Sequence, residues 1–122
     1  MTTALPGVRA HIASALSSIG VPVHTYPEGA VQPPCVLLLP GSPYRDPSTA
    51  WDSVTVGIDV RVIVSDGLGL NAQSTLDALI DAVCDALTTN GTEVGPIGAP
   101  VQEPEQAAMT CDIPTTTVWK EE

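Results

Sequence analysis

The sequence predicts an α+β fold in which a mostly antiparallel sheet of four to five strands carries two amphipathic helices packed on one face. One long stretch places apolar side chains at every second position, and two other stretches repeat them at helical spacing. With 122 residues the chain can bury a core, and it fits a single domain, 1–122. The chain has no Phe, so Val, Leu, Ile and Ala must build that core.

The stretch from Ser53 to Val64 predicts the central strand of this sheet. Its alternate positions would form one apolar face, made of Val54, Val56, Ile58, Val60, Val62 and Val64. The other face carries polar residues, with Asp59 and Arg61 near its middle. Burial is worth about 1.5 to 3 kcal/mol for each aliphatic side chain, so the apolar face requires a cover.

Two segments predict the helices that provide this cover. The first runs over 5–19 with one apolar stripe, and it places Arg9 and His11 on its exposed side. The second runs over 71–89, where Asn90-Gly91 provides a stop signal. Both helices can lie on the valine face and close a two-layer core.

Shorter strands and irregular segments complete the predicted order. Strands are expected near 21–26, 35–39 and 106–113, with a weak strand near 93–94 or 101–102. Prolines and bulky residues without periodicity predict a long loop over 40–52. Pro114 is expected to end the last strand and to leave 114–122 as a C-terminal tail, either pairing at an edge or frayed. The glycine-rich stretch 66–71 lacks the full dinucleotide fingerprint and predicts a plain turn.

Composition excludes several classes of function. Fourteen acidic and four basic residues give a net charge of −10, which argues against specific DNA binding. Cys35, Cys84 and Cys111 are odd in number and lack CxxC spacing, which predicts buried free thiols in a reducing compartment. No stretch approaches the ~20 apolar residues that span a bilayer, so we expect a soluble protein made in a cytoplasm.

The sequence offers no set of residues that predicts catalysis. His11 and His24 lie at no metal-ligand spacing from each other or from a cysteine. No pair of carboxylates is placed where an enclosed site would separate their pKa values. We therefore expect no catalytic residues, no metal site and no cofactor, and a protein that is not an enzyme.

Two groups of residues are candidates for contact with partners. Tyr44, Arg45, Asp46 and Trp51 in the predicted loop are of types often found at protein interfaces, although Trp51 could equally cover its own core. Asp77, Asp81 and Asp85 form an acidic line at spacing four on the second helix. This line is either a solvated face or an acidic surface that meets a partner or lines a channel.

The order of these features resembles the tail terminator (tail completion) proteins of long-tailed bacteriophages. The resemblance includes the proline-flanked strand Pro33-Pro34-Cys35-Val36-Leu37-Leu38-Leu39, the long alternating strand and the helix from Leu76 to Leu87. It implies a homohexameric ring that caps the tail tube, ends its polymerisation and joins the head connector, without catalysis or cofactor. DNA would only pass through, and the protein would lie at the head-proximal end of the virion tail after assembly in the host cytoplasm.

With this resemblance, Asp59 and Arg61 become candidates for the contact between subunits, together with the loop 40–52. Neck or head-tail connector proteins, of the stopper or adaptor kind, share much of this pattern and remain an alternative. An alternative of another class is a small cytosolic ligand-binding domain or enzyme, which would need a pocket with converging polar groups.

Overall fold

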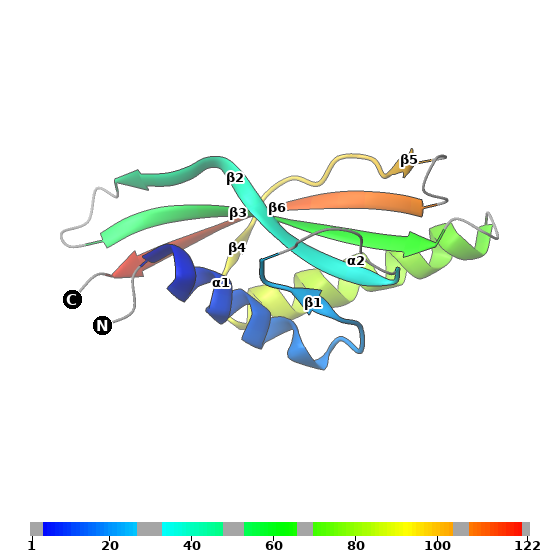
Figure 1. The fold of residues 1–122 in the computed structure, drawn as a ribbon, viewed down its shortest axis with the longest axis horizontal. Helices are drawn as coiled ribbons and strands as arrows, with labels where there is room; N and C mark the ends of the chain where they lie inside the picture. Colours follow the sequence, from blue (N-terminus) through cyan, green and yellow to red (C-terminus); the bar gives the residue numbers. More distant parts are fainter. Residues whose placement is uncertain (1–3, 27–32, 48–52, 66–69, 104–107, 121–122) are drawn as a thin grey trace.

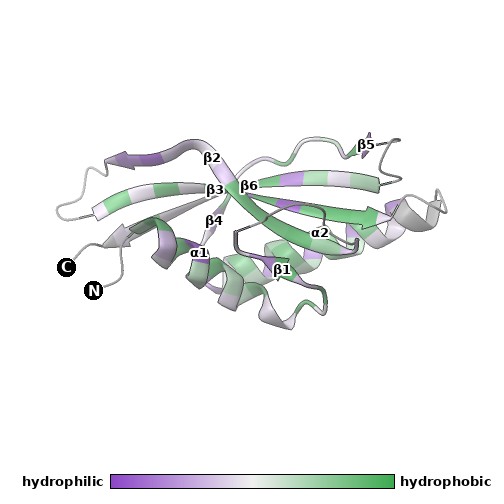
Figure 2. Cartoon of the chain, viewed as in Figure 1, coloured by the Kyte–Doolittle hydropathy of each residue, from purple (hydrophilic) through white to green (hydrophobic). Residues whose placement is uncertain are grey.

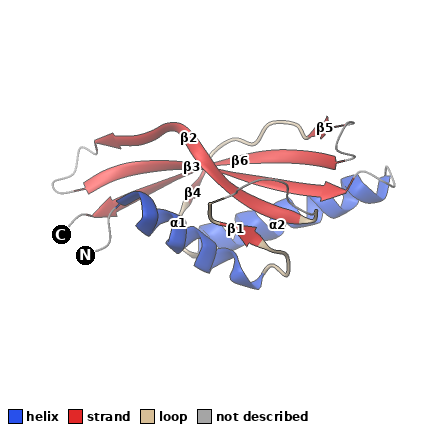
Figure 3. Cartoon of the chain, in the orientation of Figure 1, coloured by secondary structure: helices blue, strands red, loops and turns tan. Residues whose placement is uncertain are grey.

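The computed structural model describes residues 4–26, 33–47, 53–65, 70–103 and 108–120 (Figure 1). The elements follow the order α1 (Ala4–Ala15), a 3-10 turn η1 (Leu16–Ser18), β1 (Val23–His24), β2 (Cys35–Pro47), β3 (Ser53–Ser65), α2 (Leu70–Thr89), β4 (Glu93–Val94), β5 (Val101–Glu103) and β6 (Ala108–Lys120). The predicted α+β class is confirmed, since the described residues form two α-helices and one sheet of six strands (Figure 3).

The sheet is mixed, and it is larger than predicted. Its strands lie in the order β1-β2-β3-β6-β4, and β5 also pairs with β6. β1 runs parallel to β2, whereas the other described pairs are antiparallel. The pattern of residues in a two-residue strand does not encode its direction, so the sequence could not predict this pair. Both weak strands of the sequence analysis form, as β4 and β5.

β3 is the centre of the sheet, as the alternation predicts. All of its inward side chains are buried, from Val54 at 7% exposed to Val56, Ile58, Val60 and Val62 at 0%. Figure 2 shows the hydrophobic bands alternating with paler ones along this strand. Side chains of both helices join this face in one core cluster, among them Val8, Ile12, Leu16, Leu76, Val83 and Leu87.

The predicted loop over 40–52 is wrong for its larger part, because β2 continues to Pro47. The register shifts between Pro40, which faces Ile58, and Arg45, which faces Val56. The chain accommodates its prolines in this bulge and on the outer edge of the strand, where a missing N–H breaks no ladder bond. Residues 48–52 lie outside the described part.

Glycine is required where the bulge of β2 crosses β3. A Cβ on Gly57 would lie 2.4 Å from the carbonyl oxygen of Pro43, and one on Gly41 would lie 2.6 Å from the carbonyl carbon of Gly57. Neither position has room for a side chain. The two strands therefore approach each other more closely here than any other residue would allow.

The prediction that Pro114 ends the last strand is also wrong, because β6 passes through Pro114 and continues to Lys120. Of the two alternatives for the tail, the described residues after Pro114 take the paired one. The carbonyl oxygen of Pro114 accepts a hydrogen bond from the N–H of Gly95 at 2.8 Å, on the side away from β3. In an antiparallel strand the N–H and C=O of one residue point to the same neighbour, so the missing N–H costs no bond to β3. Trp119 then pairs with Val54 and packs against the main core.

Both helices end close to the predicted positions. α1 gives way to η1 after Ala15, and Gly20 follows with a φ of 86°; α2 ends at Thr89, and Gly91 follows with a φ of 83°. These are left-handed conformations that glycine adopts without strain, as expected at helix C-termini. The stop signal read from Asn90-Gly91 is therefore confirmed.

Candidate functional site

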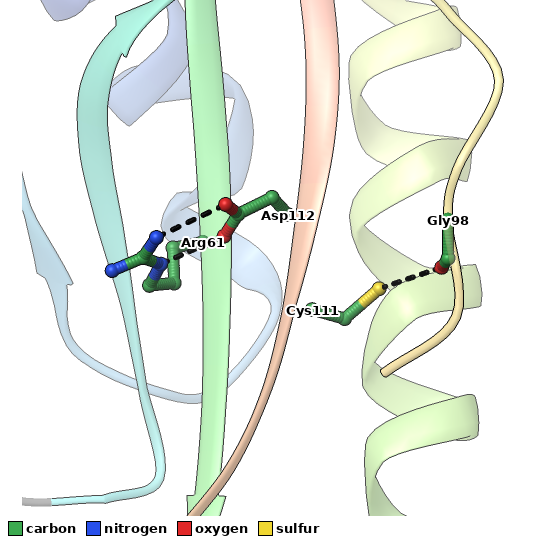
Figure 4. Close-up of polar contacts among 4 residues, drawn as sticks. All are labelled: Arg61, Gly98, Cys111 and Asp112. Carbon is green, nitrogen blue, oxygen red and sulfur yellow. Dashed lines mark hydrogen bonds and ion pairs between the residues drawn. The ribbon is translucent and has the colours of Figure 1, made fainter. Parts of the chain in front are cut away.

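The outward face of the sheet carries a fixed ion pair between neighbouring strands. Arg61 of β3 and Asp112 of β6 are register partners. Arg61 Nε donates to Asp112 Oδ1 at 2.7 Å, and its second nitrogen, Nη2, donates to Oδ2 at 3.0 Å (Figure 4). The two side chains are 40% and 41% exposed, so solvent limits the stabilisation to about 0 to 1 kcal/mol. The bidentate geometry nevertheless holds both charges in place.

Asp59 lies on the same outward face, two residues before Arg61, as the alternation predicts. Burial raises the pKa of the Asp59 carboxyl, and the negative charge of Asp112 raises it further, while Arg61 opposes the shift. Asp112 was not among the candidate residues. Alternation in the last strand places it on the polar side, but only the register of β6 against β3 brings it to Arg61.

Two shallow hollows flank this group on the sheet surface. One of about 260 Å³ is lined by Arg61 and Asp112 together with the segment around Gly98, whose carbonyl oxygen accepts a weak hydrogen bond from the Cys111 thiol at 3.6 Å. The other, of about 220 Å³, lies where the β2 bulge meets Gly57 and Asp59. In the first hollow the two opposite charges neutralise each other, which suits a contact surface better than acid-base chemistry.

The candidate residues of the predicted loop have different positions in the structure. Arg45 and Asp46 are exposed on the last part of β2, whereas Tyr44 is half-buried and packs against the main core. The Tyr44 hydroxyl also accepts a hydrogen bond from Arg9 at 3.1 Å. Trp51 lies outside the described residues. Tyr44 therefore contacts this chain's own residues, whereas Arg45 and Asp46 are the exposed members of the group.

The predicted position of Arg9 on the exposed side of the first helix is wrong. Arg9 is only 5% exposed. Its Nη1 atom donates to the carbonyl oxygen of Leu38 at 2.7 Å and to that of Thr25, and its guanidinium lies 4.6 Å from the ring centre of Tyr26. The side chain joins α1 to the first part of the sheet.

The acidic line on α2 is exposed, as predicted. Asp77, Asp81 and Asp85 all face solvent, and Asp77 accepts a hydrogen bond from Gln73 at 2.9 Å. Burial raises the pKa of the Cys84 thiol, and the charges of Asp81 and Asp85 raise it further.

A groove of about 580 Å³ lies beside this line, between the end of α1 and the second half of α2. Its lining residues are Ala15, Ser18, Ile19, Ala82, Asp85, Ala86, Thr89 and Asn90. Asn90 also contacts His11, with 2.8 Å between Asn90 Nδ2 and His11 Nε2. His11 is therefore half-buried between the two helices, so it is not fully buried, as predicted, but it is less exposed than its polar side of the helix suggested.

Other features of the described residues bear on the expected chemistry. The three cysteines are free thiols, as predicted, with Cys35 and Cys111 buried and Cys84 half-buried. Within the described ranges no group of three or more His, Cys, Asp and Glu side chains could hold a metal ion. Among the helices described, none has the length and apolar character needed to cross a membrane.

Comparison of the chain with protein-family models gave no match, and comparison with curated proteins gave none either.

Proposed function

We propose that this chain is a structural, ring-forming tail terminator of a long-tailed bacteriophage, which caps the tail tube, ends its polymerisation and joins the head connector. The observation that supports the proposal is a pair of open strand edges. Among the described residues, β2 has no outer strand partner over 39–47, and β6 has none beyond β4 over 117–120. These edges lie on opposite sides of the same end of the sheet.

Two different edges on one chain favour head-to-tail association. Such a contact, repeated with a constant rotation, closes into a ring or continues as a filament. The β2 edge contains Pro40, Pro43 and Pro47, which limit main-chain pairing, so its exposed Arg45 and Asp46 would make the contact through side chains. The β6 edge would present backbone groups and Val118, which is 62% exposed.

The other features of the chain agree with this role. Helices packed on one face of the sheet leave the outward face, with Asp59, Arg61 and Asp112, for contact with a neighbouring copy, the tube or the connector. A net charge of −10 suits a conduit through which DNA passes without binding, because few cations are available to hold phosphates. A ring of this kind works by shape and needs neither catalysis nor a cofactor.

The test is the assembly state of the purified protein, measured by native mass spectrometry and light scattering. The expected result is a single ring species, a hexamer, that Arg45→Glu and Val118→Glu each convert to monomer without loss of circular dichroism. Thr88→Glu on the exposed side of α2 adds the same single negative charge as Val118→Glu, away from both edges, and should leave the ring intact. Monomers at every concentration, with or without tube protein, would refute the proposal.

Electron microscopy with preformed tail tubes separates a terminator from a neck protein. A terminator should cap one tube end and stop the addition of tube subunits. Binding only to the connector, with tube growth unchanged, would instead favour a stopper or adaptor protein.

A further inference from the structure

The groove between the two helices has a shape suited to another helix. The α2 residues that line it include Ala82, Asp85, Ala86 and Thr89. They follow each other at spacings of three, one and three residues, so they form one stripe of the helix. Ala15 lies on the α1 side. Three of these side chains are single methyl groups, so a third helix can approach the pair closely and pack into the space between them.

The electrostatics of the groove favour a positively charged occupant. Asp85 lies in the lining, and Asp81 is exposed one turn earlier on α2. The C-terminal ends of both helices also contribute, since the stretches just before Gly20 and Gly91 line the groove. Carbonyl groups at such ends carry partial negative charge. No Lys or Arg occurs between 70 and 89, and Arg9 of α1 is bound to the sheet side.

We propose that this groove binds a basic amphipathic helix of another protein. A second copy of the chain does not fit, because the chain has only four Lys and Arg residues and none of them forms a basic helical face. Arg9 is buried and Arg61 is paired with Asp112, while Arg45 and Lys120 belong to β2 and β6. The proposal goes beyond the ring function, because the groove lies on the helix layer and the ring edges lie on the sheet.

The first experiment selects binders for the groove from a displayed library of helical peptides with randomised surface positions. The purified protein is the target, and the double variant Ala82→Leu with Ala86→Leu, which fills the groove, is used for counter-selection. Recovered peptides should carry Lys or Arg at spacings of three and four beside a small or apolar stripe. Peptides without this enrichment, or no peptide that prefers the wild-type protein, would overturn the proposal.

The second experiment measures the affinity of the best recovered peptide by fluorescence anisotropy. Asp81→Asn with Asp85→Asn should weaken binding about fivefold and reduce its salt dependence, because two charge pairs are lost. The matched control is Glu93→Gln, an exposed carboxylate of β4 outside the groove, which should change affinity less than about twofold. Equal weakening by the control would assign the binding to general attraction by an acidic protein and overturn the proposal.

If the groove-filling variant does not fold, the variant with Asp81→Asn and Asp85→Asn still tests the proposal, because these substitutions remove charge at the surface without changing packing. If the groove-filling variant folds but loses self-association, the groove is a contact between copies, and the proposal is wrong. A ring that assembles, from a protein that binds no peptide, would refute helix binding by the groove and leave the ring function standing. Peptide binding by a protein that stays monomeric would refute the ring function and leave helix binding by the groove standing.

Discussion

Replacing Gly57 with Ala should destabilise the protein, because it places a methyl group where the bulge of β2 crosses β3. The new Cβ would lie 2.4 Å from the Pro43 carbonyl oxygen, and contacts below 3.0 Å are essentially never seen, so the bulge must retreat by at least about 0.6 Å. Overpacking of this kind costs about 1 to 3 kcal/mol. The reduced entropy of the unfolded chain offsets about 0.4 to 1 kcal/mol, which leaves a net loss of about 1.3 kcal/mol at the middle of the two ranges.

Thermal and urea unfolding measure this loss, and Gly98→Ala is the matched control. No atom lies within 4 Å of a Cβ built on Gly98, so its exchange should change stability by less than about 0.5 kcal/mol. For a chain of this size each kcal/mol lowers the Tm by about 4 °C. Gly41→Ala places a methyl group at the same crossing, but from β2. The stability lost by the double variant should therefore be smaller than the sum of the losses of the two single variants. A Gly57→Ala protein as stable as the Gly98→Ala protein would show that the strands do not cross as described.

Two further predictions concern side chains that the structure places in unexpected surroundings. Asp59→Asn should stabilise the protein at neutral pH by about 0.5 kcal/mol, because it removes a carboxylate that burial desolvates and that the nearby charge of Asp112 repels. The folded-state pKa of Asp59 is raised above 3.8, so the stability from its protonated form is complete below that pH and is lost as the pH rises through the raised value. The advantage of the Asn variant should therefore vanish below pH 3.8 in a pH series of urea titrations; an advantage independent of pH would contradict this cause. Arg9→Met should cost about 3 kcal/mol, because it leaves the buried Leu38 carbonyl oxygen without its donor, whereas Tyr44→Phe removes a single neutral acceptor and should cost about 1 kcal/mol. Urea midpoints at an unchanged m value compare these two variants, and equal losses would argue against the buried role of Arg9.

The parts of the fold that the sequence predicts well are those with a strict period. A shift of one residue in the register of β3 would turn its six inward aliphatic side chains to solvent. The alternation is therefore compatible with only one choice of buried face. The two helices are similarly constrained by their apolar stripes and by Gly20 and Gly91 at their ends. In these elements local pattern and tertiary packing require the same conformation.

The parts that the sequence predicts poorly contain proline inside a strand. A proline interrupts a strand only where its missing N–H would have bonded a neighbour, and that depends on the side to which the residue points. Pro114 points to Gly95 and away from β3, so β6 continues through it. Pro40 and Pro47 belong to the outermost long strand, where β3 is the one strand in the described ranges that pairs with them. Which side a proline faces is a property of the register, and local sequence does not contain it.

The candidate site shows the same limit for charged residues. Arg61 and Asp112 are 51 positions apart, and only the pairing of β3 with β6 makes them partners. Asp59 and Arg61 could be assigned to the outward face from alternation alone, but their actual neighbours could not.

Arg9 illustrates why polarity alone misplaces some residues. β1 is only two residues long, and its last pairing joins His24 to Leu37. Leu38 is thus the first residue of β2 beyond the end of β1, and the Arg9 guanidinium donates to its carbonyl oxygen. The guanidinium of Arg9 occupies the position that a third residue of β1 would take, and it lies there among hydrogen-bond acceptors and two aromatic rings. A polar residue in a helix is therefore not evidence of an exposed face when that helix lies against the end of a short edge strand.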